Sequence, residues 1–161
     1  NKNYEKILGL NDEDTIKIVH TCANIKAQVV AEDELENGIR ALLNFGHTFG
    51  HAIEASKNYK GILHGEAVSI GMNIASAISA DRGYLDHEEY CEIEDMLNNM
   101  NMPTMIPKGV GVLSLMKHLN HDKKKISGKN RFILLNEIGG AFIDDKINDK
   151  YLADVSKNFI S

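Results

Sequence analysis

Helical spacing of apolar residues constrains the fold of this 161-residue chain more than any other sequence feature. Residues three and four apart share one face of an α-helix, and apolar side chains recur at such steps through most of the chain. The spacing predicts helices over residues 12–32, 45–57, 65–82, 86–100, 111–119 and 149–159. The apolar face of the first helix is expected to contain Ile16, Val19, Ala23 and Val30. Asp12 or Asp14 is the expected N-cap of that helix.

Two short segments near the C-terminal end interrupt the helical pattern. Residues 132–135 and 141–143 are rich in apolar and β-branched side chains, and a turn with adjacent glycines separates them, which predicts a β-hairpin. The expected fold class is mostly α: a single multi-helix domain over residues 1–161 with one small β-hairpin. The sequence has no glycine-rich loop of the kind that binds a dinucleotide between a strand and a helix.

Composition excludes several function classes. Apolar residues make up 43% of the chain and charged residues 25%, as in ordinary globular proteins. The net charge of −5 argues against non-specific nucleic-acid binding, which needs clustered cations. The chain has neither an apolar run long enough to span a bilayer nor a secretory signal at its start. We therefore expect a cytoplasmic protein with no nucleic-acid or membrane partner.

The two cysteines, Cys22 and Cys91, lie far apart in predicted helices and lack CxxC spacing. We expect both to be small core residues rather than a disulfide or a metal-binding pair, which suits a reducing cytoplasm. The chain begins at Asn1 rather than at a methionine, which fits a fragment of a longer protein or a trimmed one.

Three histidines form the most informative pattern. His47 and His51 lie four residues apart within RALLNFGHTFGHAIE (residues 40–54), so they would share one face of a helix. His64 begins the next predicted helix, in LHGEAV (residues 63–68). A neutral imidazole is a good zinc ligand. The HxxxH spacing alone also occurs in structural histidines, and the pattern is not the HExxH motif of metalloproteases.

The residues around these histidines favour a binding site. Gly46 and Gly50 lie within the expected helix, where each glycine costs ~1 kcal/mol relative to alanine. We therefore expect close approach of either a ligand or another backbone. A catalytic zinc normally has three protein ligands. Glu54 and Glu66 are each a possible third ligand, or a carboxylate that is solvated or only supports the ligands.

Several cationic and amide side chains accompany the motif. Arg40 and Asn44 precede the histidines and suit a carboxylate or a phosphate. Lys26 lies in an otherwise apolar stretch, either as a lysine at the edge of the core or as a ligand contact. The run HDKKK (residues 121–125) is either a solvated turn or a source of a phosphate contact.

Together these segments resemble the 3-dehydroquinate synthase family of sugar-phosphate cyclases. The likeness rests on Arg-x-x-x-Asn-x-Gly-His-Thr-x-Gly-His-Ala-Ile-Glu and His-Gly-Glu-Ala-Val-x-Ile-Gly-Met, and it continues upstream and downstream through most of the chain. The resemblance implies the helical C-terminal domain of a two-domain enzyme whose N-terminal, Rossmann-like domain binds NAD and is absent from this chain. It also implies zinc bound by His47 and His64, with a glutamate that precedes Asn1 as the third ligand.

The resemblance assigns further roles to single residues. His51 corresponds to a histidine near the substrate phosphate that takes part in proton transfer. Arg40 and Lys26 correspond to groups that hold the substrate carboxylate, with Lys26 also among the catalytic residues. Asn44 corresponds to a substrate or phosphate contact, and Glu36 to an active-site carboxylate. The phosphate-contacting lysine corresponds to one of two neighbours, Lys123 and Lys124.

The implied reaction converts 3-deoxy-D-arabino-heptulosonate 7-phosphate to 3-dehydroquinate and phosphate in the shikimate pathway, and the implied enzyme is a homodimer. This chain alone is expected to be inactive. The alternatives are another sugar-phosphate cyclase, a domain like those of metal-dependent glycerol dehydrogenases, and a non-catalytic helical metal-binding module. Lys26 together with Arg40 favours a substrate that carries a carboxylate.

Overall fold

The computed structural model describes residues 4–35, 38–123 and 131–161, except for the side chains of residues 121–123. The elements in chain order are α1 (Tyr4–Leu8), α2 (Asp12–Glu32), the 3-10 helix η1 (Ile39–Asn44), α3 (His47–Ser56), α4 (His64–Asp81), α5 (His87–Asn99), α6 (Val112–Lys123), β1 (Phe132–Glu137), β2 (Gly140–Asp144) and α7 (Asp149–Lys157). The predicted fold class, mostly α with one small hairpin, is confirmed. No described helix is long and apolar enough to cross a membrane.

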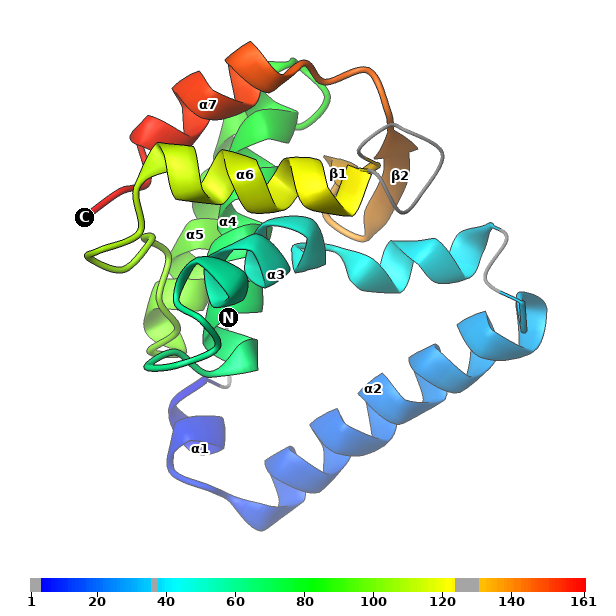
Figure 1. The fold of residues 1–161 in the computed structure, drawn as a ribbon. Helices are drawn as coiled ribbons and strands as arrows, with labels where there is room; N and C mark the ends of the chain where they lie inside the picture. The colour runs from blue at the N-terminus through cyan, green and yellow to red at the C-terminus, as the bar shows by residue number, and fades with distance from the viewer. Residues whose placement is uncertain (1–3, 36–37, 124–130) are drawn as a thin grey trace.

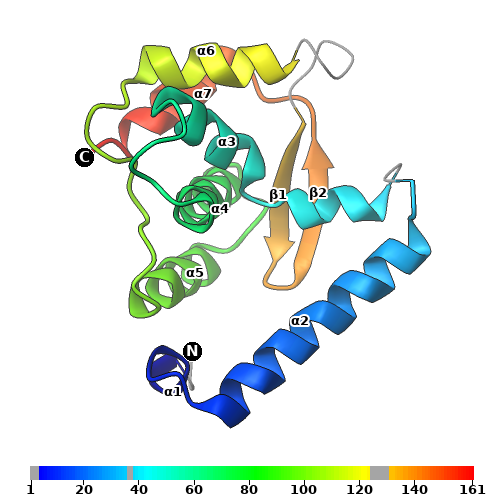
Figure 2. The same ribbon diagram turned by 60° about the horizontal axis from the view of Figure 1, so that its bottom comes forward.

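Helix α4 is the centre of the structure. It packs against α3, α5 and β1, while α6 packs against α3 and α7 (Figures 1 and 2). Its sequence is apolar or small on nearly every side, so ten of its residues are buried. The side chains at the middle of the core are fully buried: Phe49, Ile53, Ile70, Ile74, Ile78, Leu115, Leu134 and Leu152. We call residues 47–123 and 131–161 the helical body.

Three glycines allow α3 and α4 to approach closely. A Cβ atom added at Gly71 of α4 would lie 2.0 Å from the carbonyl oxygen of Gly46, and one added at Gly50 would lie 3.2 Å from the Cα of Val68. Gly46 precedes α3 with a φ of +81°, a left-handed conformation that L side chains rarely adopt. The close approach expected from Gly46 and Gly50 is therefore an approach of another backbone.

The hairpin forms as predicted and is attached to α4. β1 and β2 pair antiparallel, with Ile133 opposite Ile143 and an irregularity in register between Leu135 and Glu137. The buried hydroxyl of Ser79 on α4 accepts a hydrogen bond from the backbone N–H of Leu135 at 3.0 Å. One face of the hairpin thus closes the core beside α4.

The same end of α4 is also tied to the C-terminal elements by polar side chains. The Tyr151 hydroxyl on α7 donates a hydrogen bond to Asp81 at 2.5 Å, and burial together with this contact raises the pKa of Tyr151. Arg82 lies 3.6 Å from the buried carboxylate of Asp144 on β2. Its hydrogen bond to the Tyr84 hydroxyl is the main cause that raises the pKa of Arg82.

The N-terminal segment, residues 4–35, differs from the helical body. Helix α2 forms over the predicted residues, but it lies apart from the body and joins it through η1 (Figures 1 and 2). Neither α1 nor α2 contains a buried residue. The side chains of Ile16 and Val19, expected on a packed face, are 67% and 62% exposed.

Some sequence predictions need correction. Both cysteines are exposed rather than in the core, because α2 packs on no described element along Cys22 and Cys91 lies on the outer face of α5, beside His87. The N-cap of α2 is Asn11, whose side chain accepts a hydrogen bond from the N–H of Asp14, rather than Asp12 or Asp14. Residues 45 and 46 were expected to be helical, but α3 begins only at His47, because the left-handed Gly46 interrupts the helix.

Candidate metal site

Helix α3 presents a row of potential ligands along one face. His47, His51 and Glu54 are separated by four and three residues, so they lie one above another on consecutive turns. His64 is the first residue of α4, and the close packing of α3 on α4 brings it to this row. Three side chains of α3 and one of α4 thus come together.

The three imidazole rings lie against one another. The ring centroids of His47 and His51 are 5.5 Å apart, those of His47 and His64 are 5.5 Å apart, and those of His51 and His64 are 5.8 Å apart. Zinc–nitrogen bonds of about 2.0–2.1 Å in a tetrahedral site place two ligating nitrogens roughly 3.4 Å apart. Rings at these separations can direct one nitrogen each toward a common ion.

The hydrogen bond of His47 fixes which of its nitrogens can bind a metal. Its Nδ1 lies 3.2 Å from the carbonyl oxygen of Phe45. A carbonyl oxygen only accepts hydrogen bonds, so Nδ1 carries the proton and Nε2 carries the free lone pair. Metal-binding histidines typically hold their second nitrogen in this way.

Two sets of ligands are compatible with the geometry. His51, Glu54 and His64 offer ligand atoms that all lie within 4.8 Å of one another, whereas the sequence predicted His47 with His64. Both sets contain His64. The first set already includes a carboxylate, and the set of His47 and His64 gains one from the glutamate that the resemblance places outside this chain. Such a donor set fits a zinc-like divalent cation.

The two glutamates considered as third ligands have different partners. The carboxylate of Glu54 lies 3.1 Å from Nδ1 of His64. The carboxylate of Glu66 instead accepts a hydrogen bond from the backbone N–H of Leu63 at 2.8 Å. Glu66 therefore caps the start of α4, where backbone donors lack partners within the helix, and stabilises the turn that carries His64.

Comparison with known proteins identifies the family of the chain. A profile of the family described as 3-dehydroquinate synthase C-terminal matches residues 1–125. The chain belongs to this family.

Curated relatives agree with the family match. A 3-dehydroquinate synthase from Prochlorococcus marinus (strain MIT 9312) is 44% identical over 148 residues, which is 92% of this chain and 40% of the relative. One from Aliivibrio fischeri (strain MJ11) is 41% identical over 154 residues, which is 96% of this chain and 42% of the relative. The chain thus spans about two fifths of the length of these relatives, and its predicted resemblance to the 3-dehydroquinate synthase family is confirmed.

Solved structures share the fold. A 2-deoxy-scyllo-inosose synthase complexed with carbaglucose-6-phosphate, NAD+ and Co2+ has a TM-score of 0.76 at 26% identity, over 87% of this chain and 41% of that one. The 2-epi-5-epi-valiolone synthase ValA from Streptomyces hygroscopicus subsp. jinggangensis 5008, with NAD+ and Zn2+ bound, has a TM-score of 0.83 at 20% identity, over 98% of this chain and 44% of that one. At that identity the second likeness concerns the fold alone.

The other residues that the resemblance to 3-dehydroquinate synthases singled out are dispersed. The guanidinium of Arg40, in η1, donates to the carbonyl oxygen of Glu34 at 2.7 Å, and Asn44 is exposed at the end of η1. Lys26 is exposed on α2, and no described contact joins it to the histidines. Glu36 and Lys124 lie outside the described residues, as does the side chain of Lys123. The structure therefore brings together the three histidines of the expected 3-dehydroquinate synthase site.

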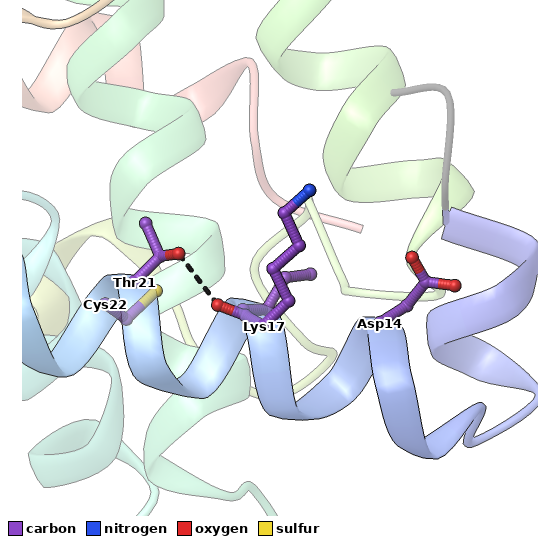
Figure 3. A pocket seen from close by; sticks show the side chains of 5 residues that line it. Asp14, Lys17, Thr21 and Cys22 are labelled. Carbon is purple, nitrogen blue, oxygen red and sulfur yellow. Dashed lines mark hydrogen bonds between the residues drawn. The ribbon is translucent and has the colours of Figure 1, made fainter.

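A small pocket on α2 is separate from the histidines. It has a volume of about 180 Å³ and is lined only by side chains of α2: Asp14, Lys17, Ile18, Thr21 and Cys22 (Figure 3). The Thr21 hydroxyl is already bonded to the carbonyl oxygen of Lys17 at 2.7 Å, the dashed line in Figure 3. This volume is below that of typical small-molecule sites, roughly 300–1,000 Å³. The pocket shows no convergence of ligand groups.

Proposed function

We propose that this chain is the metal- and substrate-binding part of a 3-dehydroquinate synthase, an enzyme that converts 3-deoxy-D-arabino-heptulosonate 7-phosphate to 3-dehydroquinate and phosphate. The observation that carries the proposal is the meeting of His47, His51 and His64 at the α3–α4 contact, with ring centroids 5.5–5.8 Å apart. The family match and the 44% identity to a relative with this name support the same activity.

In this proposal His47 and His64 bind the zinc ion, and a glutamate from the part of the enzyme that this chain does not span completes the ligand set. Nε2 is the free nitrogen of His47, because the carbonyl oxygen of Phe45 occupies the other side of the ring. When bound, zinc would act as a Lewis acid that polarises a substrate oxygen. NAD would bind to the part of the enzyme outside this chain and carry the hydride chemistry.

The remaining residues bind and orient the substrate. His51 is exposed at the edge of the metal site, where it can exchange a proton near the substrate phosphate. Arg40 and Lys26 hold the substrate carboxylate, and Asn44 with Lys123 or Lys124 contacts the substrate or its phosphate. Glu36 supplies an active-site carboxylate. Fixed charges at both ends of the substrate would select one orientation and bring its reacting groups together.

Arg40 and Lys26 must reorient, or move closer to the histidines, to hold the substrate carboxylate. The guanidinium of Arg40 donates a hydrogen bond to the backbone carbonyl oxygen of Glu34. Lys26 lies on α2, which is apart from the helical body. Both precede α3 in the chain, so a change in the position of α2 and η1 would move them together. We expect the complete enzyme, a cytoplasmic homodimer by this proposal, to place α2 against the site.

Removal of single histidines tests the metal assignment. In the full-length enzyme, His47→Ala and His64→Ala should each lower zinc affinity at least about 100-fold and abolish turnover, since losing a direct ligand should exceed the effect of losing a supporting group. His87→Ala, at the exposed start of α5, is the matched control and should keep both properties. Undiminished zinc occupancy in the His47 and His64 variants would overturn the assignment.

A substrate panel tests the activity itself. The likeness to 2-deoxy-scyllo-inosose synthase, whose structure contains a sugar-phosphate analogue, makes a related cyclase the second candidate. The full-length enzyme should turn over the heptulosonate phosphate and not glucose 6-phosphate. The opposite preference would assign the chain to the other cyclase. This 161-residue chain alone should show no turnover with substrate, NAD and zinc.

A further inference from the structure

We propose that Glu54 is a positioning residue for His64. Its carboxylate accepts a hydrogen bond from Nδ1–H of His64, fixes the tautomer in which Nε2 carries the lone pair, and directs that nitrogen toward the metal. This role rests on the metal site proposed above, but it has a separate readout in the metal-free protein.

The geometry of the pair supports this role. Oε2 of Glu54 and Nδ1 of His64 are 3.1 Å apart, a hydrogen-bond distance. The side chain of Glu54 is only 14% exposed, whereas that of His64 is 56% exposed. An exposed imidazole has little packing to select a rotamer or a tautomer. The mostly buried carboxylate can supply that selection, because its own position is held by α3.

The backbone on both sides of this hydrogen bond is fixed independently. Glu66 accepts from the N–H of Leu63, and the carbonyl oxygen of Leu63 accepts from the N–H of Ala67, so the first turn of α4 is well defined at His64. The contact of α3 with α4 through Gly50 and Gly71 sets the distance between the two helices. The backbone therefore leaves only the side-chain torsions and the tautomer of His64 undetermined, and the hydrogen bond to Glu54 selects among these.

His47 and His64 then share one arrangement. The Nδ1 of His47 faces the carbonyl oxygen of Phe45, and the Nδ1 of His64 faces the carboxylate of Glu54. In each case an acceptor holds the proton on Nδ1 and leaves Nε2 for a metal. In the described part of the chain, the side chain of His51 has no such hydrogen bond. This difference favours His47 and His64 as ligands and favours Glu54 as a residue that orients His64 without binding the metal itself.

Histidine tautomers in the metal-free chain provide the first test. Long-range nitrogen–proton NMR spectra distinguish Nδ1–H from Nε2–H imidazoles, and the signals of His64 are identified by their loss in His64→Gln. We expect the Nδ1–H form in the unmodified chain at a pH where the ring is neutral. In Glu54→Ala the Nε2–H form, which predominates in free imidazoles, should appear. Glu92→Ala, which removes an exposed carboxylate on α5, is the control and should leave the tautomer unchanged.

Metal affinity in the full-length enzyme provides the second test. Glu54→Ala should weaken zinc binding about 10- to 100-fold, the usual effect of losing a partner that orients a ligand. Glu54→Gln should recover part of that loss, because its amide oxygen still accepts a hydrogen bond from Nδ1. A direct ligand would behave differently, since an amide oxygen is a poor substitute for a carboxylate on zinc. Equal losses in the Ala and Gln variants would therefore overturn the positioning role.

The outcomes also separate this role from the metal assignment. If Glu54→Ala changes neither the tautomer of His64 nor the zinc affinity while His64→Ala abolishes binding, only the positioning role fails. If His51→Ala and Glu54→Ala both abolish binding and His47→Ala does not, the ligands are His51, Glu54 and His64, and both assignments fail.

Discussion

Helices α2 and α4 are both long and contain apolar residues at helical spacing, yet one is exposed along its length and the other is buried. Ile16 of α2 is 67% exposed, while Ile74 of α4 is 0% exposed. Helix α4 has small residues such as Gly71 that admit the backbone of α3, whereas α2 contacts mainly its chain neighbours α1 and η1. The comparison shows that periodicity predicts where a helix forms, and close packing decides whether that helix contributes to the core.

Matched truncations of isoleucine would break this comparison if they had equal effects. Ile74→Ala removes a fully buried side chain of the core and should lower the free energy of unfolding by about 2–5 kcal/mol. Ile16→Ala makes the same chemical change on exposed α2 and should change it by less than about 0.5 kcal/mol. Urea unfolding of the chain measures both. Similar destabilisation by the two variants would mean that α2 packs on the body in solution.

Alanine at two glycines of α4 would sharpen the account of the helix contact. Gly71→Ala places a Cβ atom 2.0 Å from the carbonyl oxygen of Gly46, so the helices must separate at a cost of about 1–3 kcal/mol. Gly65→Ala meets no atom within 4 Å and should be neutral or stabilise α4 by up to about 1 kcal/mol. Thermal unfolding followed by circular dichroism compares them. A neutral Gly71→Ala variant would show that the contact yields easily.

The pH dependence of stability tests the burial of a tyrosine on α5, which packs against α4, and the expected effect is smaller. Burial, together with the nearby Glu94, raises the pKa of Tyr90 on α5 to about 12. Because the pKa is raised in the folded state, the stability linked to Tyr90 is complete below pH ~10 and is lost as the pH rises from ~10 to 12. Tyr90→Phe should therefore lose less stability over this interval than the unmodified chain.

Tyr59→Phe is the control for that experiment, because the side chain of Tyr59 is 73% exposed. Its stability should follow that of the unmodified chain through the same alkaline interval. Urea unfolding at several pH values between 9 and 12, chosen around the tyrosine pKa of about 10, gives the comparison. Identical curves for all three proteins would contradict the effect of burial on Tyr90.

Much of the fold was predictable from local signals. Apolar spacing located six of the helices to within a few residues, and two short apolar segments located the hairpin. The 3-10 helix η1 was not predicted, because its six residues are too few to show a helical period. The prediction that Cys22 and Cys91 are buried was wrong, because a small apolar residue can occupy either face of an amphipathic helix.

The candidate site was partly predictable. The residue spacing of His47, His51 and Glu54 places them on one face of a helix, and the family motif points to His64 as their partner. The hydrogen bond from His64 to Glu54 was not predictable, because it joins two helices whose packing no local pattern specifies. The hydrogen bond of Glu66 to the N–H of Leu63 is local to the first turn of α4, whereas the contact of Glu54 with His64 follows only from that packing.

By itself, the sequence determined most of the helices, the hairpin, the family and the candidate site residues, because these depend on interactions and motifs within short stretches of chain. The tertiary structure decided which helices are buried, why Gly46, Gly50 and Gly71 are glycines, and which carboxylate contacts the ring of His64. These properties depend on distances between atoms that are remote in the chain. Such distances are set when side chains and backbones pack against each other, and no single segment contains them.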